Sequence, residues 1–542
     1  MVSPHVDNLV VAKDFRPVWR DQPMLLAPDV RDWLPADHVV WFLLDAVAAI
    51  DTSSVHRRAR LGGAGRSPYD PDMLLALLIY AYAGGVRSSR KVERRCREDA
   101  AFMVISGLCY PDHATIARFR KDHDGAMAEL FTAVLGLCGR AGMGALEHVA
   151  IDGTKMAADA SPSASRDADG LRALARKLID EATKVDEEED ALYGDSRGDE
   201  LPEALRDPAR RKQIIEELVK AAAADADRSR GKVRTARVDK AERALRLADE
   251  IAAETLDRAT PRRELTAARL AQAEAALAQA KAKQQAHHDD WCRREAATGG
   301  RGLPGARPSG VEEHIRVRQA AARVDAWRQR LTEREAASGQ TTGKRNITDP
   351  DSRIMPVKGG FILGYNSQLA VGADHLILAA NVVPDTGDAQ QLTPMLDQLA
   401  HAVDTLREAT NNPELAVGCA LFDAGYASVD NLSVPGPDRL IALGKRNKIA
   451  GEDPPTSPPG HNATARQNMA WRLGTPAGKA LYNKRGATVE PVNGHLKDRR
   501  GLRRFSRRGI TAARAELHLA ALTTNLLRLL AAKGPTAVAA AH

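Results

Sequence analysis

The chain has 542 residues, of which 44% are hydrophobic, 27% charged and 4% aromatic. This length predicts two to four domains of about 100–200 residues each, with enough apolar surface for a buried core. The scarcity of aromatic residues argues against a lectin-like surface or a large aromatic ligand pocket. Lys+Arg 78 against Asp+Glu 71 leaves a net charge of +7, and only the distribution of this charge can indicate a polyanionic partner.

The cysteines and the apolar segments indicate the cellular compartment of the protein. Five cysteines stand far apart without any CxxC spacing, which excludes a disulfide framework and favours a reducing compartment. The first residues lack a basic segment followed by an apolar run, and the most apolar stretch, residues 74–86, is too short to span a bilayer. We therefore expect a soluble, cytoplasmic protein without a membrane partner.

Residues 1–146 are predicted to form an all-helical domain. Residues 70–85 carry apolar side chains at three- and four-residue steps between an Asp-Pro start and a Gly-Gly stop. A basic helix follows Ser88, and another begins after the N-cap candidate Asp112. Short helices joined by tight turns, one with a basic face, are typical of helix-turn-helix DNA-binding units. A plain helical bundle with solvated arginines, or a dimerisation domain, is the alternative.

Two separated segments, 147–164 and 346–533, predict one α/β domain. The first contains a short apolar run that ends in Asp152, directly before Gly153. The second predicts a hairpin, a helix, two strands and closing helices, at residues 361–371, 375–383, 388–409, 417–422, 439–443 and 511–532. This order indicates a mixed sheet with helices on both faces, followed by a flexible tail at 534–542.

Residues 165–345 have a different composition, rich in Ala, Arg, Glu and Lys. Leu270 and Leu277 stand seven apart on an Ala-rich background, which is typical of long helices packed as a hairpin or coiled coil. The acidic run 186–190 predicts a solvated helix face, because consecutive acids on a helix point in different directions. A Gly- and Pro-bearing stretch, 299–310, predicts a loop. The block therefore indicates a helical insertion into the α/β domain.

Three carboxylates are candidates for a catalytic metal site. Asp152 and Asp423 each end an apolar run, and Glu490 lies on a predicted helix beside a basic stretch. Converging carboxylates repel one another unless cations separate them, and Mg²⁺ prefers such oxygen ligands. Two Mg²⁺ ions about 4 Å apart activate a water or a 3′-hydroxyl and stabilise the leaving oxygen in phosphoryl displacement. A single aspartate at a strand end is more often structural, so the hypothesis depends on the three acids together.

Five motifs in this order resemble a DDE transposase of bacterial insertion sequences, of the kind with a helical insertion. The residues that carry the resemblance are 67–102 and 111–123 for the N-terminal transposase domain, AIDGTKMAADAS (150–161) for the first aspartate, ITDPDSRIMPVKGGFILGYNSQLAV (347–371) for the return into the sheet, LFDAGYAS (421–428) for the second aspartate and YNKRGATVEPVNGHLK (482–497) for the tyrosine–arginine–glutamate–lysine signature. The resemblance covers nearly the whole chain.

The resemblance implies a ribonuclease H-like core in which Asp152, Asp423 and Glu490 are catalytic and bind two Mg²⁺ ions, with Mn²⁺ as an alternative. It also implies DNA contacts near the site by Tyr482, Arg485 and Lys497. The basic run that follows, with Arg499, Arg500, Arg503 and Arg504, is expected to track the phosphate backbone. Four residues separate Arg485 from Glu490 where related groups have three, so Lys484 is an alternative to Arg485. A solvated face is the alternative for the basic residues after Lys497, and packing on the sheet is the alternative for Tyr482.

The implied function is that of a transposase, which binds the terminal inverted repeats of its element, cleaves there with Mg²⁺ and joins the freed 3′-hydroxyls to target DNA. Because two ends must meet, we expect a homodimer or larger assembly on double-stranded DNA, in the bacterial nucleoid. A metal-dependent nuclease without strand transfer and a catalytically silent DNA-binding protein derived from a transposase are the alternatives.

Overall fold

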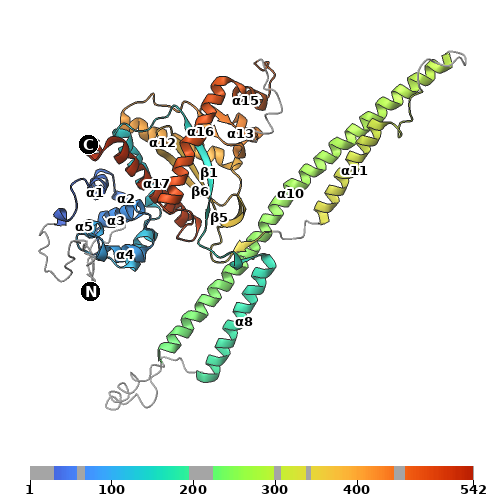
Figure 1. The fold of residues 1–542 in the computed structure, drawn as a ribbon. Helices are drawn as coiled ribbons and strands as arrows, with labels where there is room; N and C mark the ends of the chain where they lie inside the picture. Colours follow the sequence, from blue (N-terminus) through green and yellow to red (C-terminus); the bar gives the residue numbers. More distant parts are fainter. Residues whose placement is uncertain are drawn as a thin grey trace, which may run out of the picture.

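The protein is a mixed α/β chain, 62% helical, as the sequence predicts. A computed structural model describes residues 30–57, 68–193, 224–297, 307–336, 343–444 and 458–540. Figure 1 shows a core, in which a group of N-terminal helices packs beside the sheet and its helices, and a long helical arm that projects from it. In the described part of the chain no helix combines the length and apolar character needed to cross a bilayer.

The N-terminal region is helical, as predicted. Its helices are η1 (Val30–Trp33), α1 (Val39–Ala49), α2 (Ser53–His56), α3 (Pro71–Ala83), α4 (Ser89–Glu98), α5 (Ala100–Ser106), α6 (His113–Asp122) and α7 (Ala126–Arg140). Helix α3 starts where predicted because the Asp70 carboxylate caps it and Pro71 suits its first turn. The Asp112 carboxylate likewise accepts from the backbone N–H of Thr115, 2.8 Å away, at the start of α6. Helix α4 packs against α5 and α6.

The sheet has the strand arrangement expected of a ribonuclease H-like core. Its strands are β1 (Val149–Ala157), β4 (Arg353–Val357), β5 (Gly360–Gly372), β6 (Ile377–Val383), β7 (Ala420–Phe422) and β8 (Arg439–Ile441). Strand β5 pairs antiparallel with β1, β4 and β6, whereas β7 runs parallel to both β1 and β8. Consecutive residues 363–372 of β5 are all buried. Since successive side chains point to opposite faces, both faces of the sheet are covered.

Strand β1 differs from the prediction. The sequence predicts its end at Asp152 and treats Gly153 as a breaker, but β1 continues to Ala157. Its pairing with β5 runs without interruption from Val149 to Ala157, whereas its pairing with β7 stops at Ile151. Asp152 therefore lies inside a long strand, at the point where the parallel neighbour ends.

The helices around the sheet complete the core. They are η5 (Ala389–Gln391), α12 (Leu392–Thr410), η6 (Ala424–Tyr426), α13 (Val429–Ser433), α15 (Ala465–Gly474), α16 (Pro476–Gly494), the π-helical η7 (His495–Arg499), α17 (Ile510–Lys533) and α18 (Ala537–Ala540). Helix α17 packs on β6, α3 and α7, so one apolar core joins the N-terminal helices to the sheet. The end of the chain, predicted as a flexible tail, forms α18, because the apolar Ala537 and Val538 are buried against that core.

The predicted helical insertion leaves the core through a two-stranded neck, β2 (Ser165–Arg166) and β3 (Arg345–Asn346). It consists of α8 (Ala168–Tyr193), α10 (Ala224–Ala297) and α11 (Ile315–Ala336), and α10 packs against both of the others. The 74 residues of α10 span about 110 Å at 1.5 Å per residue. Leu270 and Leu277 are both half-buried on α10. The side chains of the acidic run 186–190 and most of the predicted loop 299–310 lie outside the described residues.

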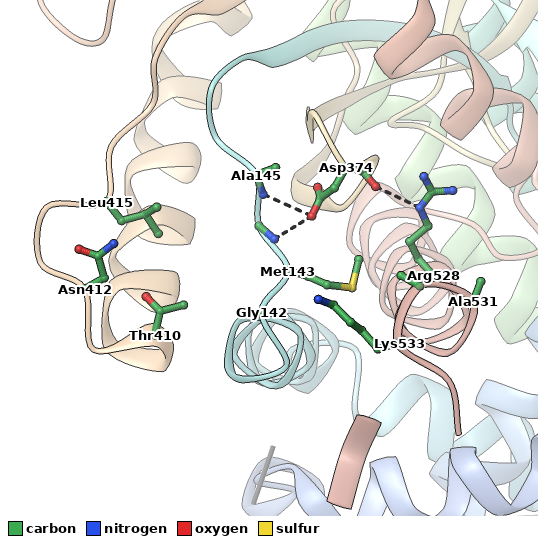
Figure 2. Close-up of a pocket in the computed structure, with 12 residues that line it drawn as sticks. Gly142, Met143, Ala145, Asp374, Thr410, Asn412, Leu415, Arg528, Ala531 and Lys533 are labelled. Atoms are coloured by element: carbon green, nitrogen blue, oxygen red, sulfur yellow. Dashed lines mark hydrogen bonds between the residues drawn. The ribbon is translucent and has the colours of Figure 1, made fainter. Parts of the chain in front are cut away.

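A cavity of about 730 Å³ lies where β1 begins (Figure 2). The carboxylate of Asp374, in the turn of the hairpin, accepts from the backbone N–H of Gly144 at 2.7 Å and of Ala145 at 3.3 Å. Arg528 of α17 donates to the Asp374 carbonyl at 3.0 Å. These bonds hold the hairpin turn against the segment that enters β1. The cavity therefore lies at the edge where β1 starts, whereas Asp152 lies where the pairing of β1 with β7 ends.

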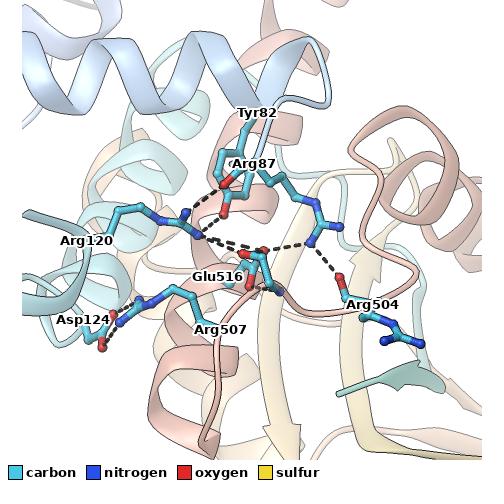
Figure 3. Close-up of polar contacts among 8 residues, drawn as sticks. Tyr82, Arg87, Arg120, Asp124, Arg504, Arg507 and Glu516 are labelled. Carbon is cyan, nitrogen blue, oxygen red and sulfur yellow. Dashed lines mark hydrogen bonds and ion pairs between the residues drawn. The ribbon is translucent and has the colours of Figure 1, made fainter. Parts of the chain in front are cut away.

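A buried charge network fixes the N-terminal helices on the core (Figure 3). We define it as Tyr82, Arg87, Arg120, Asp124, Ser506, Arg507 and Glu516. The fully buried Glu516 carboxylate lies 2.8 Å from the Arg87 guanidinium and also accepts from the hydroxyl of Ser506 at 2.8 Å. Arg120 donates to the Tyr82 hydroxyl at 2.8 Å, and Arg507 pairs with Asp124. The segment that follows Glu490 in the sequence is thereby bound to the N-terminal helices.

Candidate active site

Asp152 and Asp423 come together because they follow equivalent positions of adjacent parallel strands. Ile151 of β1 pairs with Phe422 of β7, so the next residue of each chain segment is an aspartate at the same edge. The Asp423 carboxylate caps the short helix η6 by accepting from the Gly425 N–H at 2.7 Å. The side chain of Asp152 is only 18% exposed.

The protonation of Asp152 reflects this enclosure. Burial raises the pKa of Asp152 to about 6, and the carboxylates of Asp423 and Asp388 add to the rise. Arg485 opposes it, since its guanidinium lies 3.4 Å from Asp152 Oδ1. A site that holds its carboxylates in such proximity favours cations, and Arg485 supplies one positive charge from α16.

Helix α16 presents the predicted tyrosine and arginine to the end of β7. The Tyr482 hydroxyl donates to the Phe422 carbonyl at 3.1 Å, so this side chain packs on the sheet edge next to Asp423. Although burial opposes it, the negative charges of Asp152 and Asp423 raise the pKa of Arg485 above its ordinary value. Arg485 therefore stays a cation directly beside the two aspartates. Lys484 is exposed, and among the described residues its side chain makes no hydrogen bond or ion pair with either aspartate.

Glu490 lies further along α16, and its side chain is exposed. Its carboxylate lies above Gly486, where an added Cβ would be 3.2 Å from Glu490 Oε1. Among the described residues, the one group of three or more acids, histidines or cysteines with ligand atoms within 4.8 Å of one another is His56, Asp70 and Asp72. Glu490 is therefore on the helix that reaches Asp152, but the three predicted acids are not gathered at that spacing.

Lys497 reaches the strand that carries Asp152. Its ammonium group donates to the Thr154 hydroxyl, two residues beyond Asp152 on β1. Burial and the neighbouring Arg503 lower the pKa of Lys497, whereas Asp152 opposes this shift. The predicted lysine of the signature is therefore part of the same edge as the two aspartates.

The other predicted basic residues divide into an exposed set and a buried one. Arg499, Arg503 and Arg504 are exposed, and Arg503 pairs with Asp498 at 2.5 Å. The backbone around Arg504 bridges to Ala157 at the end of β1, which holds this stretch near the site. Arg500 is only 8% exposed and donates to the Ala83 carbonyl, so its side chain joins the core to the N-terminal helices.

Sequence reasoning missed Asp388, in the turn between β6 and α12. Its Oδ1 accepts from Asn366 at 2.7 Å and from Gln368 at 2.8 Å, and it lies 3.4 Å from the Lys155 ammonium. The signal was available, because Asp388 comes after an apolar run in the sequence, as Asp152 and Asp423 do. The sequence between strand and acid, PDTG, hid it by placing the acid several residues after the strand.

The donor set suits a hard divalent cation. The side chains at this edge that could serve as ligands are the carboxylates of Asp152 and Asp423, with Glu490 on the adjoining helix, and all offer oxygen. Such ligands are those that Mg²⁺ and Mn²⁺ prefer. The guanidinium of Arg485 beside Asp152 shows that the edge already attracts positive charge. The arrangement can support metal-assisted attack on a phosphodiester by an oxygen nucleophile.

Two family models match the chain. The model described as Transposase domain (DUF772) matches residues 28–122, which include the helices from α1 to α6. The model described as Transposase DDE domain matches residues 458–530, which include α15, α16 and most of α17. No curated protein and no solved structure matches the chain. The second match therefore includes Tyr482, Arg485 and Glu490, whereas Asp152 and Asp423 lie outside both.

Proposed function

The two family matches support an insertion-sequence DDE transposase, and on this premise we propose that the chain binds the terminal inverted repeats of its element, cleaves DNA there and joins the freed ends to target DNA. The single observation that carries the proposal is the adjacency of Asp152 and Asp423 at one sheet edge, enclosed with Arg485 from the matched C-terminal segment.

We assign the chemistry to three acids. Asp152, Asp423 and Glu490 would hold two Mg²⁺ ions, or Mn²⁺ in their place. When bound, such ions lower the pKa of a water or 3′-hydroxyl nucleophile and neutralise charge on the phosphate and the leaving oxygen. Asp152 and Asp423 stand on neighbouring strands and are the fixed part of this set. Glu490 would approach them from α16.

The neighbouring side chains would orient the DNA. Arg485 and Lys497 are partly buried beside Asp152, so in our proposal they hold the scissile phosphate against the acids. Tyr482 fixes α16 to the end of β7 through its hydroxyl, and we assign it no nucleophilic role. Arg499, Arg503 and Arg504 are exposed and would follow the phosphate backbone outward, with Lys484 on the preceding helix.

The same chemistry requires two DNA ends. We propose that the N-terminal helices recognise the inverted repeats, since the matched transposase domain there includes the basic helix α4. Cleavage of both ends and their joint transfer would need at least a dimer on DNA. The buried contacts of Arg500 and of the buried charge network would then keep the recognising helices rigid relative to the acids.

A mobility assay tests the proposal. A marker flanked by the DNA that natively borders this reading frame is supplied with the wild-type protein, with Glu490→Ala or with Asp423→Ala. The matched control is Glu414→Ala, which removes an exposed acid from the segment that lines the cavity at the opposite edge of the sheet. We expect marker movement with the wild type and the control only.

Purified protein and labelled ends in Mg²⁺ separate the alternatives. A transposase forms joined products, a nuclease cuts without joining, and a silent binding protein shifts the ends in a gel but leaves them uncut. Asp423→Ala should retain binding to the ends while cleavage falls by at least about a thousandfold, of the order expected when a group essential to the transition state is removed. An Asp423→Ala protein that still cuts would overturn the assignment of the acids.

A further inference from the structure

Asp388 connects three segments of the candidate active site. It lies in the turn after β6, and its side chain is only 17% exposed. Its acceptor Oδ1 binds the side-chain amides of Asn366 and Gln368, two residues apart on β5 and therefore on the same face of the sheet. In the sheet, Asn366 pairs with Lys155 and Gln368 pairs with Gly153 of β1. Asp388 thus lies over a pair of cross-strand neighbours, on the face of β1 opposite to the side chain of Asp152, which directly precedes Gly153.

Gly153 provides the space for this carboxylate. A Cβ at residue 153 would be 2.4 Å from Asp388 Oδ1 and 2.5 Å from Gln368 Nε2, distances that ordinary side-chain contacts do not reach. The backbone of β1 is regular at this point and pairs fully with β5. The glycine after Asp152 is therefore needed for the close approach of Asp388, and not to end the strand.

The second oxygen of Asp388 is directed to the turn that carries Asp423. A Cβ on Gly425 would lie 3.0 Å from Asp388 Oδ2 and also 3.0 Å from Asp423 Oδ1. The two oxygens are thus at most twice that distance apart. In the same turn, Tyr426 is fully buried and its hydroxyl donates to Gln368 Oε1. Asp388 is therefore linked to the Asp423 turn in two ways. Its Oδ2 lies near Gly425, and its partner Gln368 accepts from Tyr426.

We propose that Asp388 is a positioning residue of the divalent-cation site, which fixes the separation of Asp152 on β1 and Asp423 after β7. A third carboxylate beside two others adds repulsion, and Lys155 and the two amides offset this only at Oδ1. Divalent cations held by Asp152 and Asp423 would supply the remaining compensation. The inference rests on the proposed function, because it assigns Asp388 a role toward the same cations.

The test measures Mn²⁺ binding to the full-length protein without DNA, by electron paramagnetic resonance. Asp388→Ala removes both oxygens, and Asp388→Asn keeps one oxygen that can accept from Asn366 and Gln368. The matched control is Asp385→Ala, in the same turn, whose carboxylate accepts instead from Gln391 at 3.2 Å. Asp423→Asn serves as the reference for loss of the site. Circular dichroism melting curves report whether each variant folds.

We expect Asp388→Ala to weaken Mn²⁺ binding by about 10–100-fold, the range seen for residues that orient metal ligands. Asp388→Asn should lose clearly less, and Asp385→Ala should bind as the wild type does. Equal losses in the Ala and Asn variants would show that only negative charge matters and would overturn the positioning role. Wild-type binding by Asp388→Ala would do the same. If the Ala variant does not fold, a loss in Asp388→Asn as large as in Asp423→Asn would overturn the proposal, and a smaller one would support it.

The reference variant separates this inference from the proposed function. If Asp423→Asn abolishes Mn²⁺ binding while Asp388→Ala leaves it intact, only the role of Asp388 is wrong. If the wild type binds no Mn²⁺, or if Asp423→Asn binds as tightly as the wild type, the proposed cation site itself is wrong. In DNA cleavage, Asp388→Ala should raise the half-saturating Mg²⁺ concentration more than it lowers the rate at saturating Mg²⁺.

Discussion

The core and the helical insertion contain the same charged residue types in opposite surroundings. In the core, Glu516 is completely buried and contacts Arg87 and Ser506. In the insertion, Glu274 of α10 and Arg328 of α11 form a pair of similar length, 3.1 Å, but remain 48% and 59% exposed. A charge therefore contributes to the fold according to its burial and its number of partners, and not according to the distance of one contact.

The difference has a physical origin. Ions at an exposed pair keep most of their hydration, so their mutual attraction adds little. Buried ions have lost their hydration and depend on each partner, which makes removal of one partner costly. The following predictions test this contrast, from the largest expected effect to the smallest.

Glu516→Ala should lower the free energy of unfolding by about 3–5 kcal/mol, because it leaves the Arg87 and Arg120 guanidinium groups without their buried counter-charge. Urea denaturation followed by tryptophan fluorescence measures the effect. Glu516→Gln is the companion variant, which keeps an acceptor for Ser506 and should lose less. A loss below about 1 kcal/mol for Glu516→Ala would show that this network is no more valuable than a surface pair.

The contribution of Asp152 to the stability of the metal-free protein should fall as the pH rises from about 4 to about 6. Folding raises the pKa of Asp152 from 3.8 to about 6, so the folded state holds a proton that the unfolded chain has released in this window. The contribution is complete below the lower value and is lost above the higher one, by about 3 kcal/mol in total. Urea denaturation at a series of pH values measures the slope.

Asp152→Asn is the control, because the stability difference between the wild type and this variant at each pH isolates the contribution of Asp152. Saturating Mg²⁺ should reduce the pH dependence of this difference, because a cation binds the ionised carboxylate and so favours loss of the proton. A difference that does not change with pH would mean that other groups cause the pH dependence.

Gly153→Ala should lower the free energy of unfolding by about 1–3 kcal/mol, the usual cost of overpacking, because its Cβ would meet Asp388 and Gln368. Gly387→Ala is the matched control, since it lies directly before Asp388 and a Cβ there meets nothing within 4 Å. Thermal melting of the two variants side by side measures the difference. Equal melting temperatures would show that the turn moves away without cost.

Arg328→Ala should change the free energy of unfolding by less than about 1 kcal/mol, because its pair with Glu274 is exposed. The measurement is the same urea denaturation, now followed by helical circular dichroism in low and in high salt. A loss as large as that of Glu516→Ala would contradict the contrast between the two regions.

Local patterns made most of the fold predictable. The heptad spacing of Leu270 and Leu277 indicates α10, and the Asp-Pro start at Asp70 indicates α3, because both signals act within one or two helical turns. The hairpin of β5 and β6 is confirmed as well, with β5 at Gly360–Gly372. These elements depend on nearest neighbours in the chain, which a sequence displays directly.

The site was less predictable because its contacts are distant in sequence. In the sequence, Gly153 indicates the end of a strand. In the structure, it instead leaves space for the carboxylate of Asp388. Arg500 belongs to a run of exposed basic residues, but its own side chain turns to the Ala83 carbonyl. In both cases the decisive partner is hundreds of residues away in the sequence, and no periodicity indicates it.

The buried charge network has a consequence for the order of synthesis. Arg87 and Arg120 leave the ribosome long before Glu516 does, and α3 and α7 must wait equally long for the apolar face of α17. A product truncated before residue 510 would leave these two cations without their counter-charge and an apolar surface uncovered. Such a fragment should be degraded rather than accumulate. A prematurely stopped chain would therefore compete poorly with the complete protein for the proposed DNA ends.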